Sequence, residues 1–291
     1  MEPEIIVLRG GGDMGSGVAC RLHRSGFRVV ILEVEQPLVV RRTVAFAQAV
    51  TDGKTTVEEI TAVRVATLAE VRRAWQDGHL PVMVDPEVKI NAELKPDVII
   101  DATLAKRDTG LRCNMAPLTI ALGPGFEAGN HAHIVIETNR GHNLGRLIFQ
   151  GEAEPNTGIP APVEGHGADR LLRAPCEGTV SHVLDIGTEV RKGEVICRVD
   201  DQPVAAPFDG IVRGLIMNGR RVPQGLKIGD VDPRPVRTHC YTISDKARAL
   251  GGSVLEAILY FRNRAETTAR IARDSLQIGI PAIRCTIRKQ G

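Results

Sequence analysis

The segment from Ile5 to Glu35 constrains the fold most, because it places a glycine-rich loop between two apolar runs. The first run, Ile5–Leu8, is typical of a short strand that is buried on both faces. A loop with the spacing GxGxxG follows, and its glycines are Gly10, Gly12 and Gly15. The next residues, SGVACRLHRSG, have helical periodicity, and the second run, FRVVILEVE, ends near Glu33. The segment therefore predicts a strand, a glycine loop, a helix and a second strand.

This order of elements is typical of the first unit of a Rossmann-type nucleotide-binding fold. Glycines let a phosphate approach the backbone amides, and the first turn of the helix, which includes Ser16, offers unpaired N–H groups. Glu33 follows Gly15 at about the distance at which an acidic residue binds a ribose hydroxyl. We therefore expect Gly10, Gly12, Gly15, Ser16 and Glu33 to bind a nucleotide-like cofactor. The alternative is that the glycines serve only the turn and the helix packing, since Asp13 would repel a phosphate.

Further apolar runs, LPVMVD, DVIIDAT and LTIALGPGF, alternate with helical stretches and predict a parallel sheet with helices between its strands. Ligands of such sheets gather at the carboxyl ends of the strands. The candidate binding residues there are Asp101, Arg107, Gly123, Gly125, Asn139, Arg140 and His142. The alternatives are that Asp101 caps a helix and that Gly123 and Gly125 form only a tight turn.

Histidine and cysteine residues give little indication of a metal or redox centre. His131 and His133 alternate with apolar residues on one predicted strand, but no third ligand lies nearby, so no metal site is predicted. The six cysteines form no CxxC pair, which excludes zinc-ribbon and thioredoxin-type motifs. Cys113, which follows Arg107, is the cysteine to test for transfer of selenium or sulfur. No residue is assigned a catalytic role.

An internal repeat follows the first half of the chain. Residues 174–196 align without gaps on residues 206–228, and both copies begin with an Ala-Pro pair. Two such halves of short strands and glycine turns resemble the barrel-sandwich hybrid fold of biotinyl and lipoyl domains. The segment that joins the halves, CRVDDQPVA, contains no lysine, so no attachment of biotin or lipoate is expected.

These patterns together predict an α/β protein with three parts. Residues 1–165 are expected to form a Rossmann-like domain with a parallel sheet. Residues 166–235 are expected to form an all-β barrel-sandwich hybrid domain, preceded by a Pro- and Gly-rich linker. Residues 236–291 are expected to form a C-terminal helical segment that packs on the body, with Ser244 as the N-cap of its helix.

Composition excludes several classes of partner. A net charge of +2 and an aromatic content of 3% argue against nucleic-acid binding. No apolar run approaches the roughly 20 residues of a membrane span, and the first residues lack the pattern of a secretory signal. A cytoplasmic location is therefore expected, and a homo-oligomer is left open.

Three sets of phrases resemble one family, the accessory proteins of selenium-dependent molybdenum hydroxylase systems (YqeB-like proteins). They are GGGDMGSGVACRLHRSGFRVVILEVEQPLVVRRTVAF, then LGPGFEAG with IETNRGHNLGR, and finally GLKIGDVDPR with ISDKARALGGSVLEAIL. The first part is also distantly similar to the XdhC-type factors that prepare the molybdenum cofactor. The resemblance implies a maturation factor that binds the molybdenum cofactor or a nucleotide such as NAD. The implied partner is a molybdenum hydroxylase apoprotein or a selenium-delivery protein.

Two other functions are left open by the residues. One is an NAD(P)-dependent oxidoreductase, which the glycine loop favours, although neither Tyr241 nor Tyr260 forms a convincing proton donor with a lysine. The other is a non-catalytic scaffold whose glycine loop binds nothing.

Overall fold

The larger body of the protein is built on a nine-stranded sheet. The computed structural model describes residues 3–156, 158 and 162–277. The strand order is β10-β9-β7-β6-β1-β2-β5-β4-β3. The strands are β1 (Ile5–Arg9), β2 (Arg28–Glu33), β3 (Lys54–Val57), β4 (Ile60–Val65), β5 (Leu80–Val84), β6 (Val98–Asp101), β7 (Leu118–Leu122), β9 (Ile134–Ile136) and β10 (Leu147–Ile148). A separate antiparallel pair joins β8 (Glu127–Ala128) to β11 (Gly151–Glu152).

Helices cover both faces of this sheet, which explains why its strands are continuously apolar. Along β1, Ile6 and Leu8 pack with helices α1 (Asp13–Arg24) and α5 (Asp245–Gln277). The alternate residue, Val7, packs on the opposite face with α3 (Leu68–Gln76) and α4 (Asn91–Leu94). The remaining helix, α2 (Ala49–Asp52), is a single turn near the antiparallel edge of the sheet.

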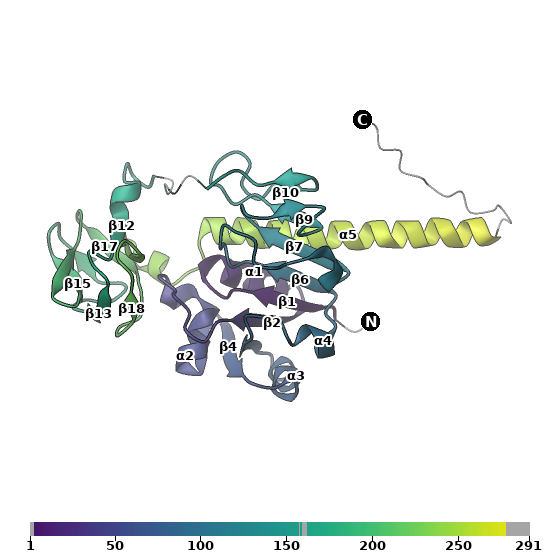
Figure 1. The fold of residues 1–291 in the computed structure, drawn as a ribbon, viewed down its shortest axis with the longest axis horizontal. Helices are drawn as coiled ribbons and strands as arrows, with labels where there is room; N and C mark the ends of the chain where they lie inside the picture. Colours follow the sequence, from purple (N-terminus) through teal and green to yellow (C-terminus); the bar gives the residue numbers. More distant parts are fainter. Residues whose placement is uncertain (1–2, 157, 159–161, 278–291) are drawn as a thin grey trace.

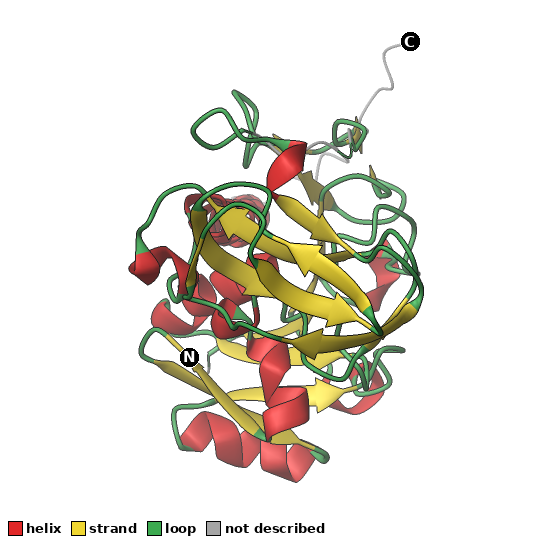
Figure 2. Ribbon diagram, turned by 90° about the vertical axis from the view of Figure 1, so that its left-hand side faces the viewer, coloured by secondary structure: helices red, strands yellow, loops and turns green. Residues whose placement is uncertain are grey.

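The smaller body consists of two four-stranded antiparallel sheets, which face the viewer in Figure 2. One sheet contains β12 (Leu171–Arg173), β19 (Lys227–Asp232), β17 (Gly210–Leu215) and β14 (Glu189–Val190). The other contains β16 (Gln202–Ala205), β15 (Val195–Val199), β13 (Gly178–His182) and β18 (Arg221–Val222). Each half of the repeat lends one short strand to the other half, because β14 pairs with β17 and β18 pairs with β13. Equivalent residues of the two halves, such as Val180 and Val212, are fully buried in one core.

The predicted fold class is wrong in two respects. The large sheet is mixed rather than Rossmann-like and parallel, because β3 and β10 run antiparallel at its two edges. At one edge, Glu58 and Glu59 form a two-residue turn between β3 and β4, with Glu58 at a φ of 53°. The repeat does not form the predicted barrel-sandwich hybrid, because its strands are divided between two separate antiparallel sheets. Residue periodicity indicates a strand but does not give the direction of its partner.

Helix α5 gives the molecule its elongated shape. It begins at the side of the sheet that faces the smaller body and extends well past the opposite end of the sheet (Figure 1). Its 33 residues correspond to a length of about 50 Å. The predicted N-cap is present, since Ser244 Oγ accepts a hydrogen bond from the Ala247 amide at 3.3 Å. Residues 278–291, the end of the predicted C-terminal helical segment, lie outside the described residues.

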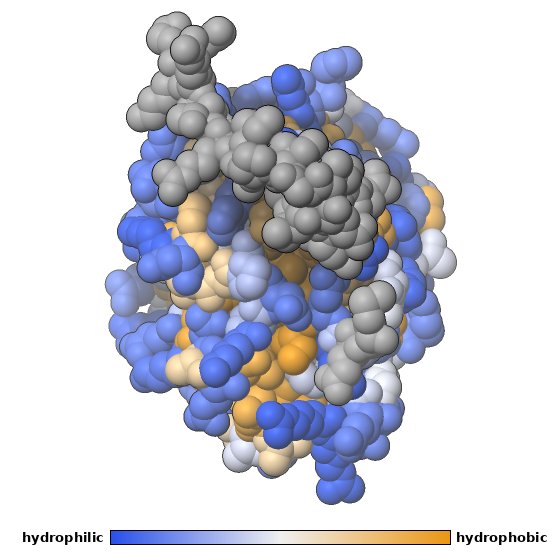
Figure 3. Space-filling view, turned by 90° about the vertical axis from the view of Figure 1, so that its right-hand side faces the viewer, coloured by the Kyte–Doolittle hydropathy of each residue, from blue (hydrophilic) through white to orange (hydrophobic). Residues whose placement is uncertain are grey.

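The surface around the projecting end of α5 is mainly hydrophilic, with apolar residues in between (Figure 3). Two exposed aromatic residues lie beside each other here, because the rings of Phe149 and Tyr260 are 5.0 Å apart between centroids. None of the described helices is long and apolar enough to cross a membrane.

Candidate functional site

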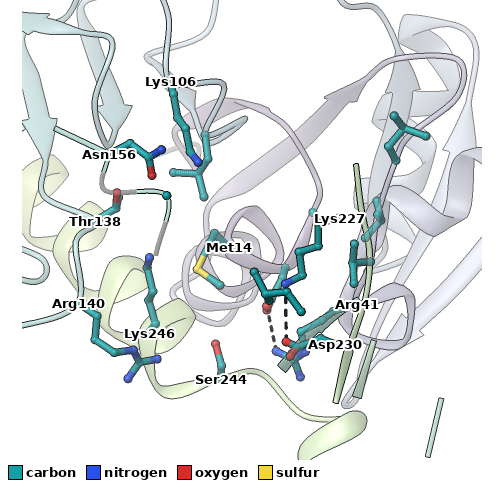
Figure 4. A pocket seen from close by; sticks show the side chains of 18 of the residues that line it. Met14, Arg41, Lys106, Thr138, Arg140, Asn156, Lys227, Asp230, Ser244 and Lys246 are labelled. Carbon is teal, nitrogen blue, oxygen red and sulfur yellow. Dashed lines mark hydrogen bonds and ion pairs between the residues drawn. The ribbon is translucent and has the colours of Figure 1, made fainter. Parts of the chain in front are cut away.

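A cleft of about 1090 Å³ lies between the larger and the smaller body. The large sheet contributes the loops at the carboxyl ends of β1, β2 and β6, and the smaller body contributes residues of β12, β17 and β19. The third contribution is the first turn of α5. Figure 4 shows that basic side chains from these segments point into the same space. The carboxyl edge of the parallel strands therefore forms the candidate site, where ligands of such sheets gather.

The three glycines of the predicted motif have different environments. Gly10 has a φ of +90° and leads the chain from β1 into the loop. Gly12 is the N-cap of α1 and lines the cleft, and a Cβ at this position would meet nothing within 4 Å. A Cβ on Gly15 would lie 1.9 Å from the Gly10 carbonyl oxygen, so this glycine serves close packing. Ser16 is fully buried, and its hydroxyl donates to the Gly11 carbonyl and accepts from the Phe46 amide.

Glu33 holds the glycine loop in place. Its Oε1 accepts a hydrogen bond from the Gly11 amide at 2.6 Å, and its Oε2 accepts one from the Val34 amide at 3.1 Å. Burial raises the pKa of Glu33, while these two hydrogen bonds act in the opposite direction. Glu33 thus lines the cleft as predicted, but both of its oxygens already bind backbone amides.

Asp13 does not present an unbalanced negative charge to the cleft. Its Oδ2 lies 2.9 Å from Nη1 of Arg41, and the Arg41 side chain is only 7% exposed. Arg41 also donates to the carbonyls of His239 and Thr242 through its other terminal nitrogen. The repulsion expected between Asp13 and a bound phosphate is therefore largely offset by Arg41.

Two helices begin at the cleft. The N-terminal residues of both α1 (12–14) and α5 (244–246) line it. Each helix N-terminus has a partial positive charge and unpaired N–H groups, which favour anions. The two helices also pack against each other, with Gly17 of α1 beside Ala247 of α5. The fold therefore directs two positive helix ends at one space.

Lys106, Arg140 and Lys246 form a first basic group, called here the Lys246 cluster. They lie on one side of Met14 in Figure 4. Arg140 pairs with the exposed carboxylate of Asp245 at 2.9 Å. Burial lowers the pKa of Lys246, and the neighbouring Arg140 lowers it further. An anion bound here would offset both effects.

A second basic group lies on the other side of Met14 and is called here the Arg41 cluster. Its basic members are Arg41, Arg170, Arg213, Lys227 and Arg234, and its acidic members are Asp13, Asp230 and Asp232. Burial lowers the pKa of Lys227 and of Arg213. For Arg213, the nearby charge of Arg41 lowers the pKa further.

The structure places five of the twelve predicted binding residues on the cleft, and seven elsewhere. The five are Gly10, Gly12, Glu33, Asn139 and Arg140. The seven are Gly15, Ser16, Asp101, Arg107, Gly123, Gly125 and His142.

Asp101 is fully buried, where it pairs with Arg9 at 3.0 Å and accepts hydrogen bonds from Thr103 and Thr109. Arg107 and His142 are exposed outside the cleft. Gly123 and Gly125, with positive φ, permit close contacts with Thr138 and with the backbone of Arg107.

The basic residues of the smaller body and of α5 were missed, because they come from segments far apart in the sequence. Lys227 and Arg234 lie within GLKIGDVDPR, and Lys246 lies within ISDKARALGG. In the sequence, both phrases carry the family resemblance, and neither indicates by itself that its basic residues bind a ligand. Their density of alternating acidic and basic residues next to strand and helix ends was a signal that could have indicated the site.

The five cysteines in the described part of the chain lie away from the cleft. Cys113 is partly exposed, and its Sγ lies 3.6 Å from the Asn130 carbonyl oxygen. Burial raises the pKa of Cys20 to about 12 and that of Cys197 to about 11, so both thiols stay protonated. Within the described part of the chain, no three His, Cys, Asp or Glu side chains are grouped in a way that could hold a metal ion.

Comparison with known proteins gives one sequence relative and several weak structural similarities. No protein-family model matches the chain. Among solved structures, the chain is similar to an aspartoacylase family protein from Mesorhizobium loti, with 13% identity, a TM-score of 0.25 and coverage of 81% of this chain and 86% of that one. The ectoine utilization protein EutE from Ruegeria pomeroyi gives 13% identity and a TM-score of 0.23, with coverage of 79% and 86%.

The sequence relative is the "Uncharacterized protein YqeB" of Escherichia coli strain K12. The two sequences are 50% identical over 256 residues. This match covers 88% of the chain and 47% of YqeB. The chain is thus similar to YqeB over most of its own sequence, and it spans about half the length of that relative.

Proposed function

We propose that the cleft binds a phosphorylated cofactor of the nucleotide or molybdopterin type. The main support is the position of Gly12. It begins α1 at the wall of the cleft with open space where a side chain would be, and the Lys246 cluster lines the same cleft. A phosphate placed there would meet backbone N–H groups, the positive end of a helix and basic side chains.

The residues present fit such a ligand in both charge and shape. The open space at Gly12 would accept a phosphate oxygen close to the backbone, and Lys106 and Lys246 would balance its charge. Thr138 and Asn139 add polar groups to the same wall. The role of these side chains is to bind and orient the ligand, and no group on the cleft is assigned a chemical step.

We further propose that the protein acts as an accessory factor in the maturation of a selenium-dependent molybdenum hydroxylase. This role is supported by the family resemblance of the sequence phrases that line the cleft, including those containing Gly12 and Lys246. The partner would be the hydroxylase apoprotein or a selenium-delivery protein. Neither tyrosine considered for an oxidoreductase lies on the cleft, and the Tyr241 hydroxyl donates to the Ile186 carbonyl.

Binding to the Gly12→Asp variant tests the proposal. The new carboxylate would occupy the position of the phosphate, whereas Asp is a favourable N-cap residue, so α1 is not expected to lose stability. Isothermal titration with ATP, NAD and the molybdenum cofactor should show at least a tenfold loss of affinity, equivalent to about 1.4 kcal/mol. Thr67→Asp at the N-cap of α3 is the matched control, since it places the same residue at a helix N-cap outside the cleft.

The proposal is wrong if none of these ligands binds the wild-type protein, or if Gly12→Asp binds them as tightly as the wild type. Binding of NAD alone would favour the oxidoreductase instead of the maturation factor.

A further inference from the structure

Several buried donors of the Arg41 cluster have no hydrogen-bond partner among the residues that the structure describes. They are Nε of Arg41, Nε of Arg213, and both Nε and Nη1 of Arg170. The whole Arg170 residue is only 9% exposed, and Nη1 lies 3.6 Å from Asp230 Oδ1, too far for a hydrogen bond. A buried donor without a partner destabilises the folded state, because its hydrogen bond to water is lost and not replaced. Four of them beside one cleft indicate that an acceptor is needed here.

The same group has more basic than acidic side chains. Five basic side chains stand against the three carboxylates of Asp13, Asp230 and Asp232. Burial and mutual repulsion disfavour the charged forms, which agrees with the lowered pKa of Lys227 and of Arg213. A dianion would restore neutrality, and its oxygens would accept from the unpaired donors.

Two acceptors of the cluster are unpaired as well, namely Asp13 Oδ1 and Asp230 Oδ1. An isolated inorganic dianion would leave them without a donor. An anionic group that stands beside hydroxyls, as the phosphate of a sugar phosphate does, would satisfy both kinds of atom.

The Arg41 and Lys246 clusters are centred on different residues, although the charge of Arg234 acts on Arg140. The charges that act on Lys227 are those of Asp230, Arg170, Asp13 and Arg213. Those that act on Lys246 are Arg140, Asp13, Glu137 and Lys106. Only Asp13 is common to both sets, and Met14 lies between Lys246 on one side and Arg41 and Lys227 on the other in Figure 4. The first turn of α1 therefore separates two positive regions of one cleft.

We infer that the Arg41 cluster is a second oxyanion subsite, and that the ligand of the cleft has two phosphate groups separated by a sugar with hydroxyls, as the pyrophosphate and the 2′-phosphate of NADP are. The cleft volume of about 1090 Å³ is at the upper end of the range for small-molecule sites, which suits a ligand of this length. The subsite stands on its own observations, whereas the ligand class rests on the proposed function of the glycine loop.

Counting the pyrophosphate ions bound per chain tests this inference. Equilibrium dialysis with labelled inorganic pyrophosphate should give two ions for the wild type, one for Gly12→Asp, one for Lys227→Met and none for the double variant. Lys192→Met, an exposed position of the smaller body outside the cleft, is the control and should still bind two. Lys227→Gln replaces Lys227→Met if that variant does not fold.

The outcomes separate the two proposals. If the wild type binds one ion that Gly12→Asp loses and Lys227→Met keeps, the second subsite is wrong and the glycine-loop site stands. If the one ion is lost only in Lys227→Met, the subsite stands and the proposed function of the loop is wrong. If no ion binds, or if Lys192→Met also loses one, both assignments are wrong.

Discussion

At the scale of single residues, two glycines of the same motif differ in whether a side chain would fit at their position. Gly12 faces open space, while Gly15 is in contact with the Gly10 carbonyl. The motif spacing predicts both but does not distinguish them, because the distinction depends on which glycine faces the cleft and which packs against the loop.

Alanine at these two positions should therefore have very different effects. Gly15→Ala is expected to lower the free energy of unfolding by about 3 kcal/mol, because its Cβ cannot fit without moving the loop. Gly12→Ala should change it by less than about 0.5 kcal/mol. Urea denaturation followed by circular dichroism measures both. Equal losses would show that Gly12 is also needed for packing.

Glu33 should make stability depend on pH. Its pKa is raised above the ordinary value of 4.5 by burial, so the folded state binds the proton more tightly than the unfolded state. The stabilisation that this proton provides is complete below pH 4.5 and is lost as the pH rises through the folded pKa. Glu33→Gln does not titrate, so its stability relative to the wild type should rise over that range, from a level that is lowered by the one hydrogen bond that its side-chain NH2 cannot accept. Urea titrations at several pH values measure the difference, and a constant difference would contradict the expectation.

Cleft residues that lie close together in the sequence could be predicted from it, and those brought to the cleft from distant segments could not. Gly12 and Glu33 were predicted because a strand, loop, helix and strand bring them together within one short segment. Asp101 was predicted to bind a ligand, but its carboxylate forms an ion pair with Arg9, which is 92 residues away in the sequence. Lys227 and Lys246 were missed because only the packing of the smaller body and of α5 brings them to the cleft.

At the scale of elements, the crossing of α1 and α5 depends on small residues. The Gly251-Gly252 pair lies within α5, and the helix is continuous through both residues with a close approach at Gly251 only. A Cβ on Gly251 would lie 2.8 Å from the Gly17 carbonyl oxygen, while Gly252 has open space. The intrinsic cost of glycine in a helix is therefore offset by packing at one position of the pair.

These neighbouring glycines provide an internal control for each other. Gly251→Ala should lower the free energy of unfolding by about 2 kcal/mol, because it forces the two helices apart. Gly252→Ala should raise it by about 1 kcal/mol through helix propensity alone. Thermal unfolding measured by calorimetry gives both signs. A stabilising Gly251→Ala would mean that the helices do not cross as closely as described.

The direction of the edge strands could not be obtained from the sequence, although most strands could be. The apolar runs predicted β1, β2, β5, β6 and β7 because burial on both faces leaves a clear pattern. The antiparallel turn between β3 and β4 contains Glu58 and Glu59 rather than the Asn-Gly or Asp-Gly of a typical two-residue hairpin. Glu58 adopts its positive φ while pairing with Arg24 and Arg248, contacts that sequence patterns do not reveal.

At the scale of the whole molecule, one short segment connects the two walls of the cleft. The Val40 carbonyl accepts from the Leu215 amide at 2.8 Å, and Arg42 Nε donates to the Leu215 carbonyl at 2.7 Å. Arg42 also pairs with Asp185. This segment leads directly from β2, so the position of the smaller body depends on the strand that presents Glu33.

Removing the Arg42 side chain should loosen this connection. Arg42→Ala is expected to lower the free energy of unfolding by about 2 kcal/mol, since hydrogen bonds from a charged donor are lost. It should also weaken pyrophosphate binding, because the smaller body is then held less firmly against the larger body and the cleft residues of the two move apart. Arg198 donates to the Asp201 carbonyl in its own hairpin, so Arg198→Ala should change neither quantity by much. Chemical denaturation and dialysis measure the two effects, and an unchanged Arg42→Ala would contradict this role.

The contact between Gly17 and Gly251 has a consequence for the evolution of the chain. A larger residue at either position can be accepted only if the two helices separate, and their N-termini would then no longer meet at the cleft. Among related sequences, these two positions should therefore covary although they lie near opposite ends of the chain. Recombination that exchanged α1 without α5 would break the cleft, so the two helices are expected to be inherited as one unit.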